Sequence, residues 1–329
     1  MRLKFLFMFV LCVTMISKIS HIEAAYTLKK GRVVNVEYIA RYSAQEHFTL
    51  GCNAVEACDW LEGLKQFRIV ITNFPTTSYG QEANYYEGVC YYNLNELDFA
   101  NESFTTYLKV QSNPRFFQET VEFKFLIAEK LSVGAKRRFF GTKKLPKWAC
   151  GKALALKIYD EVIAAVPSHD IAARALVSKG TLLWQLRDYR SCIEAFQMVI
   201  RRFPKHELTP ECYIYISRVF IDQCRIEFQN PDILAFAQIN VRKFKQEFPR
   251  EERICEAENN VQLIKEIYAK GLYDTGCFYE RKCKPQSSII YYRNTVHQFP
   301  DTDVAELCRD RLYILDPTFV NPASDPEVT

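Results

Sequence analysis

The chain has 329 residues, of which 48% are hydrophobic and 25% charged, so it can bury a core, and collagen-like, low-complexity and wholly disordered classes are excluded. Glycine (11) and proline (13) together make up about 7% of the chain, against an average of roughly 12%, which favours long helices over a β-rich fold with many tight turns. The formal net charge of +4 is small, so the composition does not indicate a polyanion-binding protein.

The first 24 residues have the pattern of a secretory signal peptide. Arg2 and Lys4 precede an apolar run over residues 5–16, and small residues follow at the end of the segment. A basic start, a short apolar run and a small-residue exit are typical of such a signal, and the run is too short to cross a bilayer comfortably. We therefore expect export, with an uncleaved N-terminal anchor as the alternative. Cys12 is not preceded by the small residues of a lipoprotein signal, so lipidation there is not expected.

After a lead segment at 25–41, the chain repeats a phrase that ends in Phe-Pro or Val-Pro. Counting back from each proline, a small residue stands twelve positions earlier and a large apolar or aromatic residue eight positions earlier, and three copies have a glycine twenty-four positions earlier. A further copy fits if its final loop, which ends at Pro114, is two residues longer. The packing positions that this spacing identifies are Gly51, Gly63, Phe67, Gly88, Ala100, Phe104, Gly180, Cys192, Phe196, Gly276 and Tyr292.

This spacing predicts antiparallel pairs of helices. Small residues let two helix backbones approach, an aromatic side chain fills the space beside them, and proline ends the second helix. One such hairpin cannot bury its apolar face alone, so neighbouring hairpins must stack. We predict an all-α fold, a solenoid of five to six hairpins like those of tetratricopeptide repeats (TPR), in a single array over 42–315 and followed by a disordered tail at 316–329. The hairpins are expected at 42–74, 79–111, 114–166, 169–203, 208–248 and 252–299, with a last helix at Val304–Leu315.

A basic segment at 136–148 interrupts the repeats inside the third hairpin. It has six positive charges, no acidic residue, and two phenylalanines and a tryptophan among the cations. Such a segment can dock on an anionic partner such as lipid headgroups, an acidic protein face or a charged glycan. The alternative is a solvated loop whose aromatic side chains pack back onto the helices; RNA binding is not expected of an exported chain. The candidate docking residues are Lys136, Arg137, Arg138, Phe139, Phe140, Lys143, Lys144, Lys147 and Trp148.

No set of residues in the sequence indicates catalysis. The five histidines are scattered, and the chain has no His-Glu-x-x-His metal motif, no phosphate-binding glycine loop and no Gly-x-Ser-x-Gly turn. We therefore predict a non-enzymatic protein with no catalytic residue, no metal site and no cofactor.

Eleven cysteines lie outside the signal segment, an odd number that cannot pair completely within one chain. Cys192 stands at a small-residue position of the repeat, where a thiol packs as a compact apolar group. We interpret most of the cysteines in this way. One or two disulfides remain open in an oxidising compartment, and Cys277 and Cys283 are the nearest local pair.

Two stretches have a more specific pattern than the rest of the repeats. One opens with Phe-Pro-Thr-Thr-Ser-Tyr at 74–79, and the other closes with Phe-Pro-Asp-Thr at 299–302. In these stretches the chain resembles the BamD family of periplasmic scaffolds for outer-membrane protein assembly, whose members show an "FP.S.Y" opening and a "YPDT" close.

The resemblance implies a non-enzymatic periplasmic scaffold associated with the outer membrane. Its N-terminal repeats would receive unfolded segments of outer-membrane proteins, and its C-terminal repeats would contact the barrel-insertion machinery through candidates Lys265, Glu266 and Lys270. Peripheral membrane contact would fall to the basic segment, and no nucleic acid is expected. The alternative is a general exported TPR adaptor for envelope organisation, division or secretion.

Overall fold

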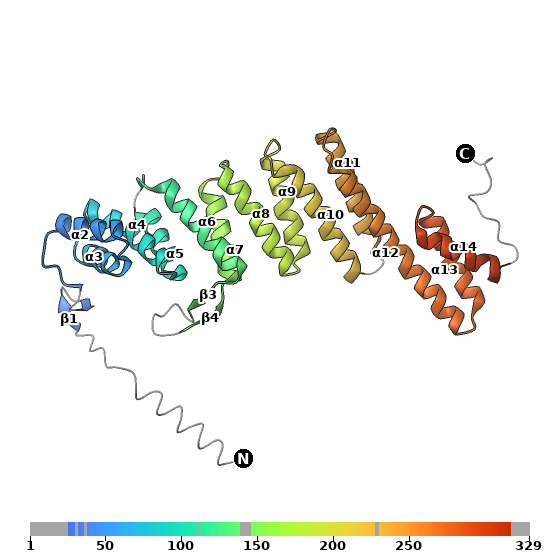
Figure 1. Cartoon of the computed structure of the whole chain (residues 1–329), viewed down its shortest axis with the longest axis horizontal. Helices are drawn as coiled ribbons and strands as arrows, with labels where there is room; N and C mark the ends of the chain where they lie inside the picture. The colour runs from blue at the N-terminus through green and yellow to red at the C-terminus, as the bar shows by residue number, and fades with distance from the viewer. Residues whose placement is uncertain are drawn as a thin grey trace, which may run out of the picture. The chain divides into compact units, whose positions relative to one another are not determined.

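The computed structural model describes residues 26–29, 32–35, 38–110, 112–138, 146–227 and 230–316. The predicted signal peptide and the tail beyond residue 316 therefore lie outside the described residues. The described part contains thirteen helices and four short strands, so the all-α prediction is confirmed (Figure 1). The helices are α2 (Ala44–Glu56), α3 (Trp60–Asn73), α4 (Ser78–Asn93), α5 (Leu97–Val110), α6 (Phe117–Val133), α7 (Lys152–Ala165), α8 (Asp170–Gln185), α9 (Tyr189–Arg202), α10 (Thr209–Ile226), α11 (Pro231–Glu247), α12 (Ile254–Arg281), α13 (Pro285–Gln298) and α14 (Asp303–Leu315).

The helices form consecutive antiparallel pairs of the TPR-like type, from α2–α3 to α12–α13, with α14 as a last single helix. Each predicted hairpin coincides with one pair to within three residues at either end. Contacts within the chain define two compact units. The first comprises residues up to Thr120 together with Arg137–Ala149, and the second comprises Val121–Lys136 and the chain from Cys150 onward.

The strands form two small pairs that belong to no larger sheet. In the lead segment, β1 (Tyr26–Lys29) pairs antiparallel with β2 (Arg32–Asn35). Inside the third hairpin, β3 (Lys136–Arg138) pairs with β4 (Lys147–Cys150). The basic segment is thus a strand pair where it is described, and not an irregular loop.

A glycine faces a fully buried aromatic ring in four of the hairpins. A Cβ atom built on Gly88 would lie 2.6 Å from the ring of Phe104, and one on Gly180 would lie 2.6 Å from the ring of Phe196. The same contact joins Gly51 to Phe67 and Gly276 to Tyr292. The small-residue positions Gly63, Ala100 and Cys192 are buried as well. Any side chain at the glycine would force the two helices apart or displace the ring.

The second helix of five hairpins ends two residues before the proline. These helices end at Asn73, Ala165, Arg202, Glu247 and Gln298. The residue between each helix and its proline has nearly the same backbone conformation throughout, for example φ −132° and ψ 48° at Phe74 and φ −132° and ψ 57° at Phe299. Proline also begins α11 and α13, where its missing N–H costs no helical hydrogen bond.

The first helix of four hairpins ends in a left-handed turn residue that the sequence analysis did not anticipate. These residues are Cys58, Asn95, Arg187 and Cys283, with φ between 55° and 61°. At Arg187 the N–H donates to the carbonyl of Trp184 (2.9 Å), and the next N–H donates to that of Leu183 (3.0 Å). This is the Schellman pattern, which most often uses glycine. Cys277 lies inside α12, which continues to Arg281, so the helix is not interrupted at that cysteine.

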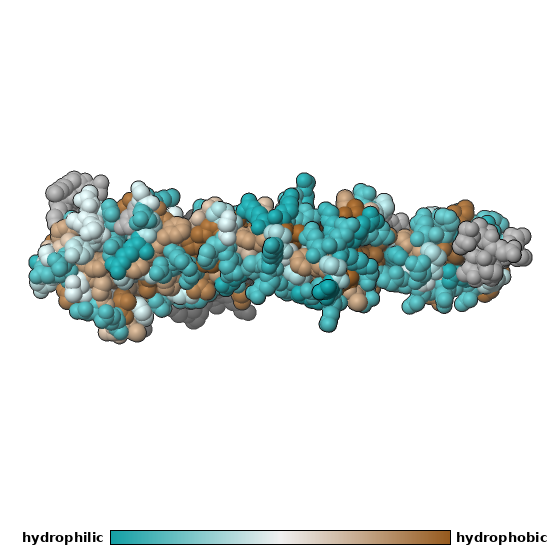
Figure 2. Space-filling view, turned by 90° about the horizontal axis from the view of Figure 1, so that it is seen from above, coloured by the Kyte–Doolittle hydropathy of each residue, from teal (hydrophilic) through white to brown (hydrophobic). Residues whose placement is uncertain are grey.

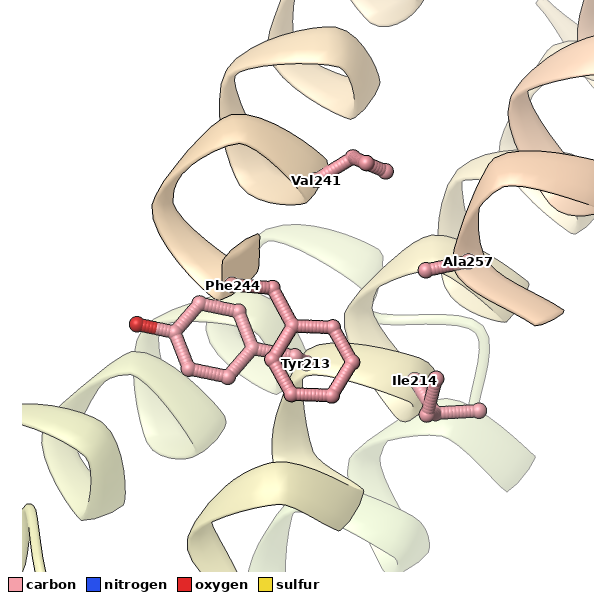
Figure 3. Close-up of a cluster of buried hydrophobic side chains, with 5 residues drawn as sticks. All are labelled: Tyr213, Ile214, Val241, Phe244 and Ala257. Atoms are coloured by element: carbon pink, nitrogen blue, oxygen red, sulfur yellow. The ribbon is translucent and has the colours of Figure 1, made fainter. Parts of the chain in front are cut away.

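Helix α12 has 28 residues, about twice the length that the repeat spacing suggested. Its N-terminal part packs on α10 and α11, where Ala257 joins the buried cluster of Tyr213, Ile214, Val241 and Phe244 (Figure 3). The rings of Tyr213 and Phe244 stack at 4.8 Å within this cluster. The C-terminal part of α12 packs on α13 through Gly276. One continuous helix of the second unit therefore packs on α10 and α11 with its first part and on α13 with its last part.

We predict that Gly88→Ala lowers the free energy of unfolding by about 1–3 kcal/mol, because the new methyl group overlaps the buried ring of Phe104. The matched control is Gly63→Ala, where the nearest atoms would lie at 3.2 Å and 3.3 Å. There the gain in helix propensity, of about 1 kcal/mol, should offset the tighter contact. Urea unfolding followed by circular dichroism measures both. Equal stability of the two variants would contradict the packing role of Gly88.

Candidate functional site

The first unit carries a row of half-buried aromatic rings, which we call the aromatic strip: Phe48, Tyr79, Tyr86 and Phe116. Phe48 comes from α2, the two tyrosines from α4, and Phe116 from the segment just before α6. Ring centroids lie 5.3 Å apart for Phe48 and Tyr79, 5.5 Å for Phe48 and Tyr86, and 5.7 Å for Tyr86 and Phe116. Neighbouring rings therefore contact one another along the whole strip.

Buried rings support the aromatic strip on the side that faces the core. Phe67 of α3 stacks on Tyr86 with centroids 5.2 Å apart, and Tyr85 stacks on Phe116 at 4.5 Å. Phe67 is the same ring that packs against Gly51, so the repeat packing fixes the strip directly. Side chains supported in this way lose little conformational freedom when a ligand binds.

Charged and polar side chains flank the strip. Burial raises the pKa of the Tyr86 hydroxyl, and the nearby Cys52 and Glu82 add to the rise. Arg115 acts in the opposite direction on that pKa, and its guanidinium lies 5.1 Å from the centroid of Phe116. The strip thus has an acidic and a basic group beside its apolar surface. Such a surface suits an extended peptide with apolar side chains and polar backbone groups.

The sequence did not separate core tyrosines from surface tyrosines in α4. In the structure Tyr85 and Tyr91 are buried, whereas Tyr86 and Tyr92 are half-buried. The helical periodicity of the repeat positions predicts that Tyr91 is buried, but the burial of the other three tyrosines depends on contacts outside α4.

The face in Figure 2 shows neutral and hydrophobic residues among the polar ones over α2 to α5, whereas it is mostly hydrophilic over α9 to α11.

The basic segment is anchored to the turn between α4 and α5. Arg138 donates two hydrogen bonds to the Glu96 carboxylate (2.9 and 2.6 Å), and Lys147 Nζ lies 3.3 Å from the same group. Lys147 also donates to the backbone carbonyl of Asn95 (2.7 Å), and the Arg138 N–H donates to Asp98 (2.8 Å). These two candidate docking cations thus have internal partners. Of the other candidates, Lys136, Arg137 and Trp148 are exposed, and Phe139, Phe140, Lys143 and Lys144 lie outside the described residues.

The two carboxylates at this anchor have opposite pKa shifts. Hydrogen bonds from Arg138, with help from Lys147, hold the pKa of Glu96 below its ordinary value of 4.5. Burial raises the pKa of Asp98, although the N–H of Arg138 partly opposes the rise. Asp98 Oδ1 is buried and has no hydrogen-bond partner, which is consistent with this rise. Glu96 is therefore the group that holds both cations.

Two of the three C-terminal candidates join α12 to the start of α14. Lys265 pairs with Asp301 (2.9 Å), and the Glu266 carboxylate accepts the N–H of Asp303 (2.7 Å). Lys270 pairs with Asp274 (3.0 Å) within α12. The last two also line an open groove, together with Arg225, Ile267, Gly271, Asp274 and Val304. Their internal contacts thus leave part of Glu266 and Lys270 at the surface of the second unit.

Three histidines have structural contacts, and one of them, His206, lies 2.8 Å from the Asp170 carboxylate. Buried His47 accepts hydrogen bonds from the N–H groups of Arg41 and Tyr42 (both 3.2 Å), and His169 caps α8. Over the described ranges, no cluster of three or more His, Cys, Asp or Glu side chains could hold a metal ion. No helix in the same part of the chain combines the length and apolarity needed to cross a bilayer.

The cysteines divide into a buried and an exposed group. Cys90, Cys192, Cys212, Cys224 and Cys308 are buried, and burial raises the pKa of Cys192 to about 12. These five pack as compact apolar groups. The remaining cysteines do not fit that interpretation: four are exposed and two are half-buried, as free thiols.

Comparison with known proteins adds only distant structural matches. No protein-family profile and no curated protein sequence matches the chain. A TPR repeats protein (BF2334) from Bacteroides fragilis has 10% identity and a TM-score of 0.40, over 83% of this chain and 99% of that one. MamA has 14% identity and a TM-score of 0.37, over 65% and 94%. The apo form of RapI has 13% identity and a TM-score of 0.38, over 82% and 76%.

The two stretches that resemble the BamD family share one local structure. Thr77 Oγ1 donates to the carbonyl of Phe74 (2.7 Å) and accepts from the N–H of Gly80 (3.0 Å). Thr302 Oγ1 donates to the carbonyl of Phe299 (2.7 Å) and accepts from the N–H of Ala305 (3.2 Å). Both threonines cap the first helix after a hairpin. These motifs therefore encode the turn between hairpins.

We predict that Glu96→Gln loosens the β3–β4 pair, because a neutral amide replaces the carboxylate that binds Arg138 and Lys147. The loss should be about 1–2 kcal/mol locally, seen as roughly 5- to 30-fold faster hydrogen exchange at the Arg138 amide. Glu102→Gln, at an exposed position of α5, is the control.

The same contact should depend on pH. The folded-state pKa of Glu96 is lowered, so its stabilisation is complete above the ordinary value of 4.5 and is lost as pH falls through the folded-state pKa. Exchange at Arg138, corrected for intrinsic rates, should therefore accelerate as pH falls below about 4.5 in the natural chain and much less in Glu96→Gln. Identical pH profiles would rule out Glu96 as the anchor.

Proposed function

We propose that this chain is a non-enzymatic scaffold whose aromatic strip binds an extended segment of a partner protein. A TPR-like helical fold is consistent with protein–protein interaction, and the observation that carries the proposal is the row of supported, half-buried rings on the first unit. Fixed aromatic side chains are the usual anchors of protein recognition, because they bury much area at a small entropic cost.

The dimensions of the strip suit an extended peptide. Side chains on one face of such a peptide recur about every 7 Å. Neighbouring ring centroids lie 5.3 to 5.7 Å apart, so each of these side chains can contact one or two rings. Glu82 and Arg115 beside Tyr86 offer one acceptor and one donor for backbone amides or charged side chains. Apolar or aromatic residues at alternate positions of the partner segment would then contact the rings.

We propose further that the bound segments are unfolded parts of outer-membrane proteins, and that the chain acts in the periplasm at the outer membrane. Support for this narrower function comes from the predicted signal peptide and the resemblance to the BamD family. In that case the barrel-insertion machinery would contact the C-terminal repeats, near Lys265, Glu266 and Lys270. The alternative, a general exported TPR adaptor, uses the same strip for other partners.

Peptide binding tests the strip. Fluorescence anisotropy should detect binding of a labelled peptide from the C-terminal strand of an outer-membrane barrel, with apolar residues at alternate positions. Tyr86→Ala and Phe116→Ala should each weaken binding about tenfold or more, as expected for an aromatic anchor. Tyr313→Ala, which removes an exposed ring of α14, is the matched control and should leave affinity unchanged. Equal affinity of all variants would exclude the strip as the binding site.

Identification of the bound partners distinguishes a role in outer-membrane protein assembly from that of a general exported adaptor. We predict that cross-linked pull-down from envelope fractions of the source organism recovers the barrel-insertion subunit, and that depletion lowers several outer-membrane barrels together. Normal barrel levels with disturbed division or secretion would favour the general adaptor instead. Loss of recovery in a Lys265→Glu, Lys270→Glu variant would assign the contact to the C-terminal repeats.

A further inference from the structure

The two faces of the β3–β4 pair have different roles. Arg138 and Lys147 both reach Glu96, so their face is turned toward the α4–α5 turn. Successive side chains of a strand point to opposite faces, which places Arg137 and Trp148 on the face turned away from that turn. Trp148 is 75% exposed, a high value for a side chain of its size. We call this side, which has Arg137 and Trp148, the outer face of the strand pair; Lys136, at the start of β3, is also exposed.

Part of the positive charge of the segment is exposed to solvent. Residues 136–148 contain six cations and no acidic residue. Glu96 binds two of these cations, Arg138 and Lys147, on the inner face. Lys136 and Arg137 are exposed to solvent, as is Trp148. The outer face therefore combines positive charge with a large exposed indole.

We propose that the outer face of the β3–β4 pair docks on an anionic lipid surface. Tryptophan is enriched at the boundary between lipid headgroups and hydrocarbon, because its ring is apolar and its N–H can remain hydrated. Lysine and arginine next to it gain attraction from anionic headgroups.

The anchor on Glu96 gives this contact its geometry. The bonds from Arg138 to Glu96 and Asp98 fix the strand pair on the α4–α5 turn, so docking does not require ordering of this part. The aromatic strip and the outer face both belong to the first unit but use different side chains. Lipid docking is therefore an activity separate from the binding of partner segments.

Vesicle co-sedimentation tests the proposal on the chain from residue 25 onward, the mature form that the export prediction specifies. Vesicles of equal parts phosphatidylglycerol and phosphatidylcholine should bind the chain, and pure phosphatidylcholine should bind it far less. The double variant Lys136→Glu, Arg137→Glu should bind at least tenfold more weakly, since each basic residue near such a surface contributes roughly fivefold. Binding should also fall as salt rises.

A control with the same change of charge separates the outer face from net charge. Arg201→Glu, Arg202→Glu alters an exposed basic pair on α9 and should leave vesicle binding nearly unchanged. Tryptophan fluorescence should shift to the blue on binding, and Trp148→Phe should remove that shift, because Trp60 and Trp184 are already half-buried. Circular dichroism confirms that each variant is folded.

Three results would overturn the proposal. One is the absence of binding to phosphatidylglycerol vesicles at low salt, and another is equal weakening by the two double variants. The third is capture of the chain by an acidic polypeptide, but not by vesicles, with loss of capture in Lys136→Glu, Arg137→Glu. That last result would make the outer face a contact for an acidic protein.

Discussion

The close contact between a glycine and a buried aromatic ring sets the geometry of the helical pairs. At Gly51, Gly88, Gly180 and Gly276 the ring of the second helix lies where a Cβ atom would stand. The helix backbones can therefore approach until the ring fills the space between them, and the pair buries an apolar face that the next pair must cover. The low glycine content and high aromatic content are consistent with this contact, since a pair that uses it needs only one such glycine and one ring.

The aromatic strip depends on the same packing. Phe67, held against Gly51, is the ring on which Tyr86 of the aromatic strip stacks. The anchor of the β3–β4 pair is equally local: Asn95 adopts the left-handed conformation that ends α4, and Glu96 follows it directly. That turn presents the carboxylate to Arg138 and Lys147. Core packing and turn conformation thus position both surfaces of the first unit.

The sequence was sufficient for the hairpins because their signals are local and repeated. Proline fixes where a helix ends, and the glycine-to-ring spacing recurs, so bounds could be predicted closely. The aromatic strip could not be predicted, because the burial of Tyr85 and Tyr86 depends on residues outside α4, such as Phe116 and Phe67. The repeat spacing alone predicts a helix about half as long as α12, although no proline stands between residues 254 and 281 to divide it. Arg138 and Glu96 are 42 residues apart in the sequence, so no local pattern predicts their pairing.

A double-mutant cycle on Gly88 and Phe104 tests the central contact most directly. Phe104→Leu replaces the ring that the methyl group of Gly88→Ala would overlap with a smaller side chain. The effects of the two changes on the free energy of unfolding should therefore not add. We predict that the double variant is more stable than the sum of the single effects implies, by about 1–2 kcal/mol. Additivity within about 0.5 kcal/mol would contradict the account, because the glycine would then not be required by the ring.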